Sequence, residues 1–253
     1  FSSCSRLVIA KIQMSGSFYD LSCMTYSSDG KIFQVEYAQK AVDNSETILG
    51  VVCKDGVILG AEKLMISKLL VSGTNKRIYN VHDHCGMVIG GRVPDGRHMV
   101  NIARQQANDY KKNYDLDMGG SVLVDRVALN FHQNTLLYYE RPYGCSAIFA
   151  CYDQLSGYSL KMIEPSGLAL GYYGCAAGKG KQIAKSHLDK INFKEMTCEQ
   201  ALKDVVKMIH LSHEEFKEKR LEVEISWVCD STKQKHEFVP QNLLEKAEEV
   251  ALE

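Results

Sequence analysis

The chain has 253 residues, 45% of them hydrophobic and 24% charged, and its 30 basic and 31 acidic residues leave a formal net charge of −1. This composition excludes a disordered or fibrous chain, and the balanced charge excludes a general electrostatic attraction to nucleic acid or anionic membrane. A chain of this length buries one sizeable core, so we expect a single domain.

The first half of the chain begins with a predicted helix and two predicted hairpins. Apolar residues recur every three or four positions along residues 32–42, which indicates a helix. Asp55-Gly56 lies between two apolar runs and predicts a hairpin with a type I′ turn, whose two central residues both need positive φ. A second pair of strands is expected at residues 78–81 and 87–90.

Two helices are expected next. Asp95 follows Pro94 at the start of the first helix, and we expect the Asp95 side chain to cap it. Apolar side chains from Met99 to Tyr114 then lie on one face of that helix. The second helix is expected at residues 121–138.

The second half predicts an antiparallel meander, two helices, a last hairpin and a terminal helix. Short apolar runs separated by turn residues indicate the meander, and Thr197 with Gln200 has the pattern of a capping box. The predicted strands are residues 147–152, 158–163, 168–173, 221–229 and 236–239, and the predicted helices lie near residues 179–190, after Thr197 and after Pro240. Strand runs that alternate with helix pairs favour an α+β fold with two antiparallel sheets face to face between helices.

The cysteines and the apolar runs bear on where the protein resides. Nine cysteines are an odd number and form no CxxC pair, so neither a zinc ribbon nor a disulfide framework is expected. No apolar run approaches the roughly 18 residues that a membrane helix needs, and residues 7–10 are too short for the core of a signal peptide. We therefore expect a protein of the cytoplasm and the nucleus. Residues 1–13 precede Met14 and are treated as a candidate extension of the reading frame.

Several local patterns suggest chemistry but have simpler interpretations. His82, His84 and Cys85 are close enough to suggest a metal site, yet no fourth ligand is spaced to complete it, so a turn with polar histidines is favoured. Residues 174–181 resemble a phosphate-binding loop only superficially, because Cys175 stands where that loop needs glycine and Gln182 where it needs serine or threonine; a tight turn into a helix is favoured. His213 continues an apolar helical stripe, which favours a core or edge histidine. No pair of carboxylates has a spacing that supports acid–base catalysis, so no catalytic residue, cofactor or metal is expected.

Two early runs resemble the N-terminal signature of the alpha subunits of the 20S proteasome. They are Tyr19-Asp20-Leu21-Ser22 and the SDGKIFQVEYA run at residues 28–38. The agreement continues through the Asp55-Gly56 hairpin, the RPYGCS run at residues 141–146 and the strand of Trp227, so it extends over residues 19–250. It implies a single alpha-type domain at residues 19–253 after a flexible N-terminal leader, or gate tail, at residues 1–18. Within that family, the runs at residues 19–22, 75–77, 171–176 and 194–198 are most similar to the alpha type 3 subunit.

The resemblance implies the N-terminal-nucleophile hydrolase fold, a four-layer αββα sandwich of two antiparallel sheets between helices. In this family the helix that carries FQVEYA joins neighbouring subunits in a seven-membered ring, and it blocks the cleft that holds the active site in catalytic beta subunits. Such a helix needs more than one face away from solvent, which suits aromatic and apolar side chains on different sides. The implied ring-contact residues are Phe33, Gln34, Val35, Glu36 and Tyr37.

The resemblance also implies that this chain is not an enzyme. A catalytic relative uses an N-terminal threonine, whose free amine helps to activate the hydroxyl. The matching position here is Glu46, and Thr47 falls one residue late. Glu62 matches the supporting aspartate, and Arg77 matches the catalytic lysine. A guanidinium stays protonated to above about pH 12 and cannot be tuned for proton transfer as a buried lysine can.

Two further sites follow from the resemblance alone. Alpha subunits of the family close the substrate pore with their N-terminal tails, and a cluster holds the open gate; its implied members are Tyr19, Asp20, Ser28 and Tyr37. Ser28 replaces the proline of most relatives, and loss of a fixed φ predicts a less rigid turn. Activators of the family dock C-terminal carboxylates between alpha subunits, commonly against a lysine. The matching pocket residues here are Arg77, Gly91 and Arg92.

We therefore expect a non-catalytic structural and gating subunit of the outer alpha ring of the 20S core. It would support ring assembly, substrate entry and activator docking in ubiquitin-dependent and ubiquitin-independent protein degradation. The implied partners are other alpha subunits, beta-ring subunits, a regulatory particle or other activators, and protein substrates in transit, with no nucleic acid and no membrane. The alternative is an inactive homologue that acts as a binding module outside the proteasome. The apolar and aromatic groups of residues 33–42 favour the ring, because a monomer has little use for them.

Overall fold

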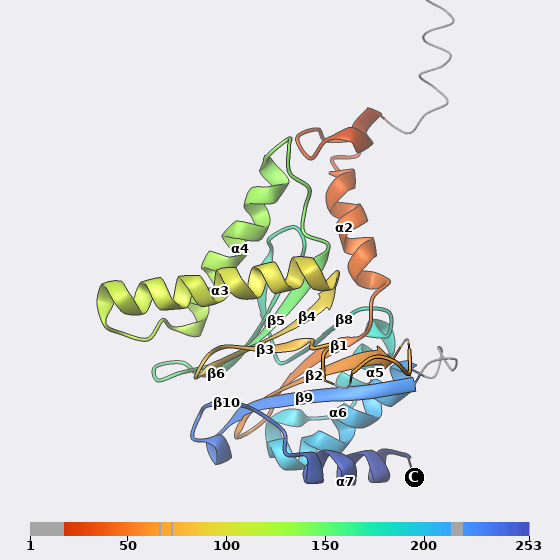
Figure 1. Cartoon of the computed structure of the whole chain (residues 1–253), viewed down its shortest axis with the longest axis vertical. Coiled ribbons are helices and arrows are strands. Elements are labelled where there is room, and N and C mark those ends of the chain that lie inside the picture. Colours follow the sequence, from red (N-terminus) through yellow and green to blue (C-terminus); the bar gives the residue numbers. More distant parts are fainter. Residues whose placement is uncertain (1–17, 66, 72, 214–219, 253) are drawn as a thin grey trace, which may run out of the picture.

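The computed structural model describes residues 18–65, 67–71, 73–213 and 220–252 (Figure 1). The predicted leader and gate tail at residues 1–18 therefore lies outside the described residues, except for its last position. Within the described ranges, no helix is both long enough and apolar enough to cross a membrane.

The described residues form two five-stranded antiparallel sheets. The first sheet has the strand order β10-β9-β2-β1-β8, and the second has the order β3-β4-β5-β6-β7. The strands are β1 (Ile48–Val52), β2 (Gly56–Met65), β3 (Ile78–His82), β4 (Cys85–Gly91), β5 (Cys145–Asp153), β6 (Gly157–Ile163), β7 (Ala169–Tyr172), β8 (Gly174–Ala177), β9 (Arg220–Cys229) and β10 (His236–Phe238).

Helices cover the outer faces of both sheets. In Figure 1, α3 and α4 lie on one side of the sheet pair and α5, α6 and α7 lie on the other. The helices are α2 (Phe33–Asp43), α3 (Val93–Tyr114), α4 (Gly120–Leu136), α5 (Lys181–Leu188), α6 (Cys198–His213) and α7 (Gln241–Leu252), with short 3-10 turns η1 (Phe18–Leu21), η2 (Phe193–Glu195) and η4 (Asp230–Thr232).

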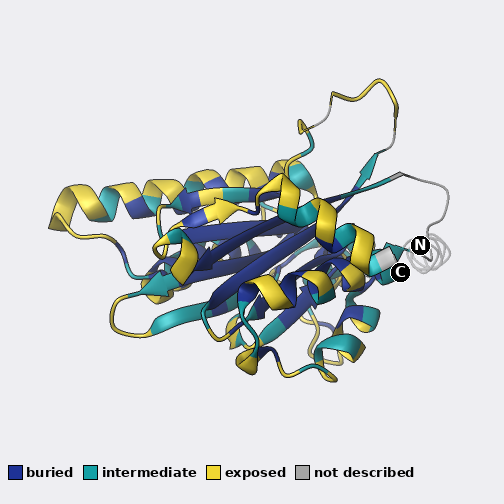
Figure 2. Cartoon of the chain, turned by 90° about the horizontal axis from the view of Figure 1, so that it is seen from below, coloured by how far each residue is buried: buried dark blue, intermediate teal, exposed yellow. Residues whose placement is uncertain are grey.

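Three apolar cores hold these layers together. One lies between the first sheet and α5 to α7, a second lies between the second sheet and α3 with α4, and the third fills the space between the two sheets. Alternation along β2 explains the pattern: Leu59 and Ala61 contribute to the core between the sheets, while Ile58 faces the helices. The central strands β1, β2, β4 and β5 are buried on both faces, as Figure 2 shows, which accounts for their mostly apolar sequence. The predicted α+β class and the αββα sandwich are confirmed.

The hairpin at Asp55-Gly56 forms, but not with the predicted turn. β1 and β2 pair in antiparallel register, whereas neither Asp55 nor Gly56 has the positive φ that a type I′ turn needs. Tertiary contacts hold this turn instead, because the Asp55 carboxylate accepts the Cys198 N–H at 2.7 Å. Glycine is required at position 56 for space, since a Cβ there would lie 2.4 Å from the carbonyl oxygen of Val228 on β9.

The predicted role of Asp95 as a helix cap is wrong. Arg92 is the N-cap of α3 and makes no side-chain cap bond, while Asp95 lies inside the first turn. Its carboxylate is 8% exposed and accepts hydrogen bonds from both terminal nitrogens of Arg141, at 2.6 and 2.8 Å, and from the Gly144 N–H at 2.9 Å. By contrast, the predicted capping box of Thr197 and Gln200 forms in both directions at the start of α6.

One strand was not predicted. Residues 174–177, interpreted above as part of a turn into a helix, form β8 and pair with β1 at the edge of the first sheet. Small residues make up this strand, so it carries no alternating pattern that period-2 analysis could detect.

Candidate functional site

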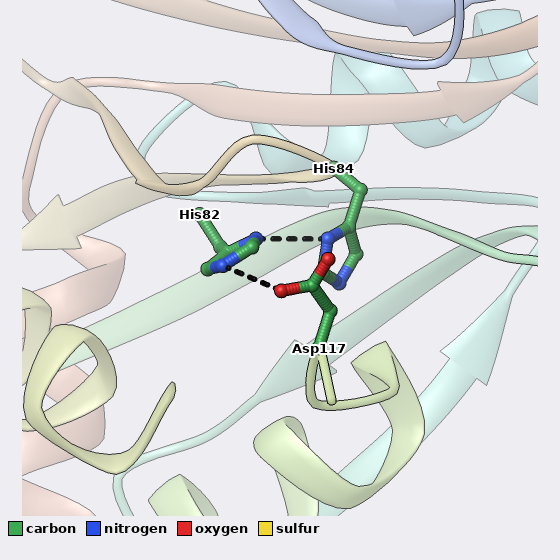
Figure 3. Close-up of side chains that lie close together, drawn as sticks. All are labelled: His82, His84 and Asp117. Atoms are coloured by element: carbon green, nitrogen blue, oxygen red, sulfur yellow. Dashed lines mark hydrogen bonds and ion pairs between the residues drawn. The ribbon is translucent and has the colours of Figure 1, made fainter. Parts of the chain in front are cut away.

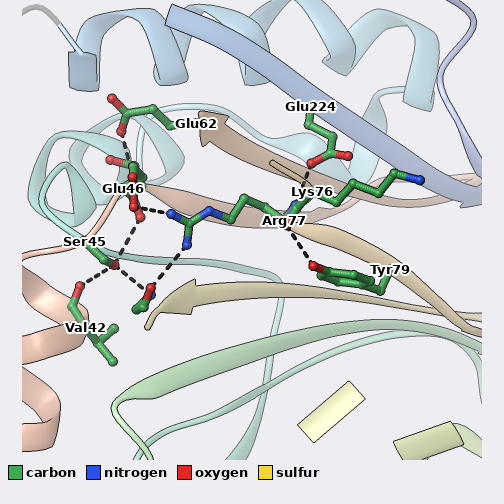
Figure 4. Close-up of polar contacts among 10 residues, drawn as sticks. Val42, Ser45, Glu46, Glu62, Lys76, Arg77, Tyr79 and Glu224 are labelled. Carbon is green, nitrogen blue, oxygen red and sulfur yellow. Dashed lines mark hydrogen bonds and ion pairs between the residues drawn. The ribbon is translucent and has the colours of Figure 1, made fainter. Parts of the chain in front are cut away.

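Arg77 is the centre of a buried polar cluster at the edge of the sheet pair. As a whole residue it is only 4% exposed. Nη2 lies 2.5 Å from Oε2 of Glu46, and Nη1 donates to the Gly91 carbonyl oxygen at 3.2 Å (Figure 4). The carboxylate of Glu46 therefore neutralises the guanidinium, as a buried arginine requires.

Glu224 fixes the backbone where Arg77 enters β3. Its Oε2 accepts the N–H of Arg77 at 2.8 Å and that of Ile78 at 3.3 Å. Glu224 lies on β9, where it is the register partner of Ala61 on the neighbouring strand β2. The sequence analysis did not single out this residue, although charged residues that alternate with apolar ones along β9 were a detectable signal.

Thr47 has no free amine. Its backbone nitrogen belongs to the peptide bond after Glu46, and its N–H donates to Oε2 of Glu62 at 2.9 Å. Its hydroxyl oxygen accepts the N–H of Gly180 at 3.1 Å, and the residue is fully buried. The amine that an N-terminal nucleophile would use is therefore an amide nitrogen here, and it is already hydrogen-bonded.

Glu62 completes the cluster on its other side. It is 2% exposed, and its second carboxylate oxygen lies 3.0 Å from Nδ1 of His213 on α6. The preference for a core or edge histidine at position 213 is therefore confirmed. Next to Glu62, the buried Lys63 pairs with Glu222 at 3.1 Å.

The glycines after β8 allow the chain to pass close to this cluster. Gly178 has φ +98°, and a Cβ there would lie 2.5 Å from the carbonyl oxygen of Glu46. A Cβ on Gly180 would lie 2.7 Å from the hydroxyl oxygen of Thr47. These glycines serve close backbone packing around Glu46 and Thr47.

The helix α2 is only partly covered by its own chain. Ala38 and Val42 are buried against the body, whereas the predicted ring-contact residues Phe33, Gln34 and Val35 are half-buried and Glu36 and Tyr37 are exposed. Phe33 and Tyr37 stack with ring centroids 6.2 Å apart. Figure 1 shows the start of α2 standing away from the sheets, together with η1.

Two members of the predicted gate cluster are in contact. The Asp20 carboxylate interacts with the Tyr37 hydroxyl, and this interaction is the main reason that the pKa of Tyr37 is raised above its usual value. Nε2 of Gln34 donates a hydrogen bond to the Asp20 carbonyl oxygen, which fixes the same segment against α2. Among the described residues, Tyr19 and Ser28 are both exposed and make no side-chain hydrogen bond to either. The cluster as a whole stays a prediction.

The three predicted activator-pocket residues lie close together but differ in their exposure to solvent. Arg77 contacts Gly91 directly, and both are buried, whereas Arg92 is exposed. Because the guanidinium of Arg77 is already ion-paired with Glu46, only Arg92 offers an exposed cation among these three residues. Use of the pocket stays a prediction.

Comparison with known proteins identifies the family. The family model "Proteasome subunit" matches residues 42–228, and the model for the N-terminal signature of A-type proteasome subunits matches residues 19–41. The chain is 49% identical to the proteasome alpha type-3 protein of Acanthamoeba castellanii, with 93% of each chain covered. It is 47% identical to the alpha type-3 protein of Spinacia oleracea, covering 93% of this chain and 94% of the relative. It is 44% identical to the probable proteasome alpha type-7 protein of Saccharomyces cerevisiae, covering 92% and 82%. The chain belongs to the proteasome subunit family, with the N-terminal signature of its alpha members.

Proposed function

We propose that this chain is a non-catalytic structural and gating subunit of the outer alpha ring of the 20S proteasome core. In that position it supports ring assembly, substrate entry and activator docking, in ubiquitin-dependent and ubiquitin-independent protein degradation. Its partners are other alpha subunits in a seven-membered ring, beta-ring subunits, regulatory particles or other activators, and substrates in transit. It acts in the cytoplasm and the nucleus.

The uncovered half of α2 carries this proposal. An amphipathic helix of a monomer buries its apolar stripe against its own core, yet Phe33 and Val35 stay half-buried and Tyr37 is 40% exposed. These residues lie within the segment that matches the N-terminal signature of the alpha members. A neighbouring subunit packed on this helix would bury them, and interfaces of standard size bury about 800 Å² per partner.

The cluster around Glu46 supports the absence of catalysis. A threonine nucleophile needs a hydroxyl that substrate can reach and a base to take its proton. Thr47 is fully buried, and its nitrogen is part of the peptide bond with Glu46. Glu46 itself forms an ion pair with Arg77. The chain thus contributes shape and contacts to the complex, while neighbouring beta subunits perform the hydrolysis.

Native-size fractionation tests the ring role. Tagged protein from its own cells is fractionated, the co-eluting proteins are identified by mass spectrometry, and each fraction is assayed for peptidase activity. Co-elution with six other alpha subunits, beta subunits and peptidase activity is the expected result. Elution as an inactive monomer would leave the fold intact and overturn the function.

A pair of variants links the result to α2. Phe33→Ala with Tyr37→Ala removes the stacked rings and should shift the chain out of the large complex without unfolding it, because neither ring is fully buried in the single chain. Leu155→Ala removes an equally apolar side chain from the fully exposed turn between β5 and β6 and should leave incorporation unchanged. Equal incorporation of both variants would contradict a ring contact through α2.

A further inference from the structure

Three side chains that could ligate a metal ion meet far from the cluster of Arg77. His82 ends β3, His84 lies in the tight turn before β4, and Asp117 lies in the connection between α3 and α4. One ligand atom from each residue lies within 4.8 Å of the other two. Figure 3 shows the three side chains turned toward one another. Cys85, which the sequence placed with these histidines, instead points into the core toward Cys151.

The hydrogen bonds bring the Nδ1 atoms of the two histidines together. Nε2 of His84 lies 3.0 Å from the Met118 carbonyl oxygen, which is an acceptor only, so this Nε2 carries a proton and Nδ1 of His84 presents a lone pair. The two Nδ1 atoms are 2.9 Å apart and hydrogen-bonded, so His82 donates its Nδ1–H to His84. When a metal ion takes the place of this proton, both Nδ1 atoms can be ligands, and the His82 proton can move to Nε2, which lies 3.3 Å from Oδ1 of Asp117.

This arrangement is the one that metal-bound histidines use. Such histidines donate their second N–H to a carbonyl or a carboxylate, which fixes the tautomer and the ring orientation. Here Met118 supplies the carbonyl for His84 and Asp117 supplies the carboxylate for His82. The acceptors that a metal site needs around its ligands are already present.

The turn that carries the histidines is held in place from outside. The Asp83 carbonyl accepts the N–H of His236 at 2.6 Å, and the His84 carbonyl accepts the N–H of Tyr152 at 3.0 Å. A register shift between Asn80 and His82 redirects the end of β3. The ligands therefore need little ordering when an ion binds.

Distance and charge select the class of ion. With metal–nitrogen bonds of about 2.05 Å, nitrogens 2.9 Å apart subtend about 90° at the ion, whereas a tetrahedral zinc site needs about 3.3 Å. An angle near 90° suits the tetragonal sites of Cu²⁺ and Ni²⁺. Lys111 competes for Asp117, with its Nζ 2.9 Å from Oδ1, but its side chain is 54% exposed and free to turn toward solvent.

From these observations we propose that His82 and His84, supported by Asp117, bind a late first-row divalent transition-metal ion, with Cu²⁺ bound more tightly than Ni²⁺ or Zn²⁺. The two Nδ1 atoms are ligands, and the Asp117 carboxylate holds His82 and adds negative charge beside the ion. The affinity order follows the general preference of imidazole ligands among these metals. The site does not depend on the proposed function.

Equilibrium dialysis of the full chain against Cu²⁺, after removal of bound metal, tests the site. One tightly held equivalent is expected, and its electron paramagnetic resonance spectrum should show hyperfine lines from two imidazole nitrogens. His82→Asn and His84→Asn should each weaken binding about tenfold or more, and Asp117→Asn should weaken it less, as a partner outside the first set of ligands does.

The matched control is His98→Asn, which removes an exposed histidine from α3 and should leave the binding unchanged. Circular dichroism of each variant establishes that the fold is intact. The proposal is overturned if no equivalent is retained, if the double variant of His82 and His84 retains it, or if the spectrum lacks two nitrogen donors. Zn²⁺ binding more tightly than Cu²⁺ would overturn the assigned geometry.

Discussion

Oε2 of Glu46 lies 2.5 Å from Nη2 of Arg77, so the residue expected at the nucleophile position neutralises the residue expected at the catalytic-lysine position. The arginine side chain is 5% exposed and that of Glu46 is 19% exposed. The two charges therefore neutralise each other in a largely buried setting.

Removing one member of this pair should destabilise the chain strongly. Glu46→Ala leaves an uncompensated buried guanidinium and should lower the free energy of unfolding by about 3 kcal/mol, as breaking a buried pair does. Glu46→Ala with Arg77→Met removes both charges and should restore at least half of that loss. Urea denaturation measures both. Glu199→Ala, at an exposed position of α6, serves as the control, and a Glu46→Ala variant as stable as that control would contradict the argument.

The bidentate pair of Asp95 and Arg141 predicts a pH-dependent contribution to stability. Burial raises the pKa of Asp95, but hydrogen bonds from Arg141 and from the Gly144 N–H outweigh it and leave the pKa below its usual value of 3.8. Asp95→Asn should therefore lower the free energy of unfolding at pH 7 by about 2 kcal/mol, the range for hydrogen bonds to a charged group.

The sign of this effect follows from linkage. A lowered carboxyl pKa stabilises the folded state above pH 3.8, and the contribution disappears as the pH falls through the folded-state pKa. Denaturation of the wild type and of Asp95→Asn should thus differ at pH 7 and converge in acid. Asp109→Asn on the same helix is the control, and a difference that persists unchanged in acid would refute the assignment.

His236 should make the chain less stable in mild acid. Its ring packs on Gly86, its Nε2 lies 2.9 Å from the Ser226 hydroxyl, and burial lowers its pKa from 6.5 to about 4. The unfolded chain binds this proton more readily, so stability is full above pH 6.5 and falls as the pH drops from 6.5 toward 4, by at most about 3 kcal/mol. His236→Asn should flatten that part of the stability profile. The exposed His98→Asn should retain the wild-type slope, and equal slopes for both variants would rule out His236 as the source.

Ser28→Pro should rigidify the turn before α2. Ser28 is the second residue of a turn that is closed by a hydrogen bond of 2.9 Å from the Gly30 N–H to the Ser27 carbonyl oxygen. Proline is favoured at the second position of such turns. The substitution should stabilise the turn by about 0.4–1 kcal/mol, which would slow amide exchange at Gly30 about two- to fivefold. Asp29→Pro, one position later, should instead weaken the turn, because proline is disfavoured there. In the assembled core, a pore-opening assay in which Ser28→Pro changes nothing would separate this turn from the gate.

Much of the architecture was readable because local patterns and tertiary packing agree. Short apolar runs bounded by turn residues predicted nearly all of the strands, and the Thr197–Gln200 capping box formed as expected. The errors came where a distant segment decided the outcome. Asp95 pairs with Arg141 instead of capping α3. The Asp55-Gly56 turn is shaped by close packing of Gly56 against the backbone of β9. β8 has only small residues, so its partner β1 defines it.

Residue identity along the chain was enough to predict the family and nearly the whole order of the elements. Which charges neutralise one another depended on the folded arrangement. Glu46 and Arg77, or Asp95 and Arg141, are separated by long stretches of chain, and burial in a medium of low dielectric makes each buried charge depend on its spatial neighbour. The same packing brought the two histidines and the aspartate to one place and left the start of α2 uncovered.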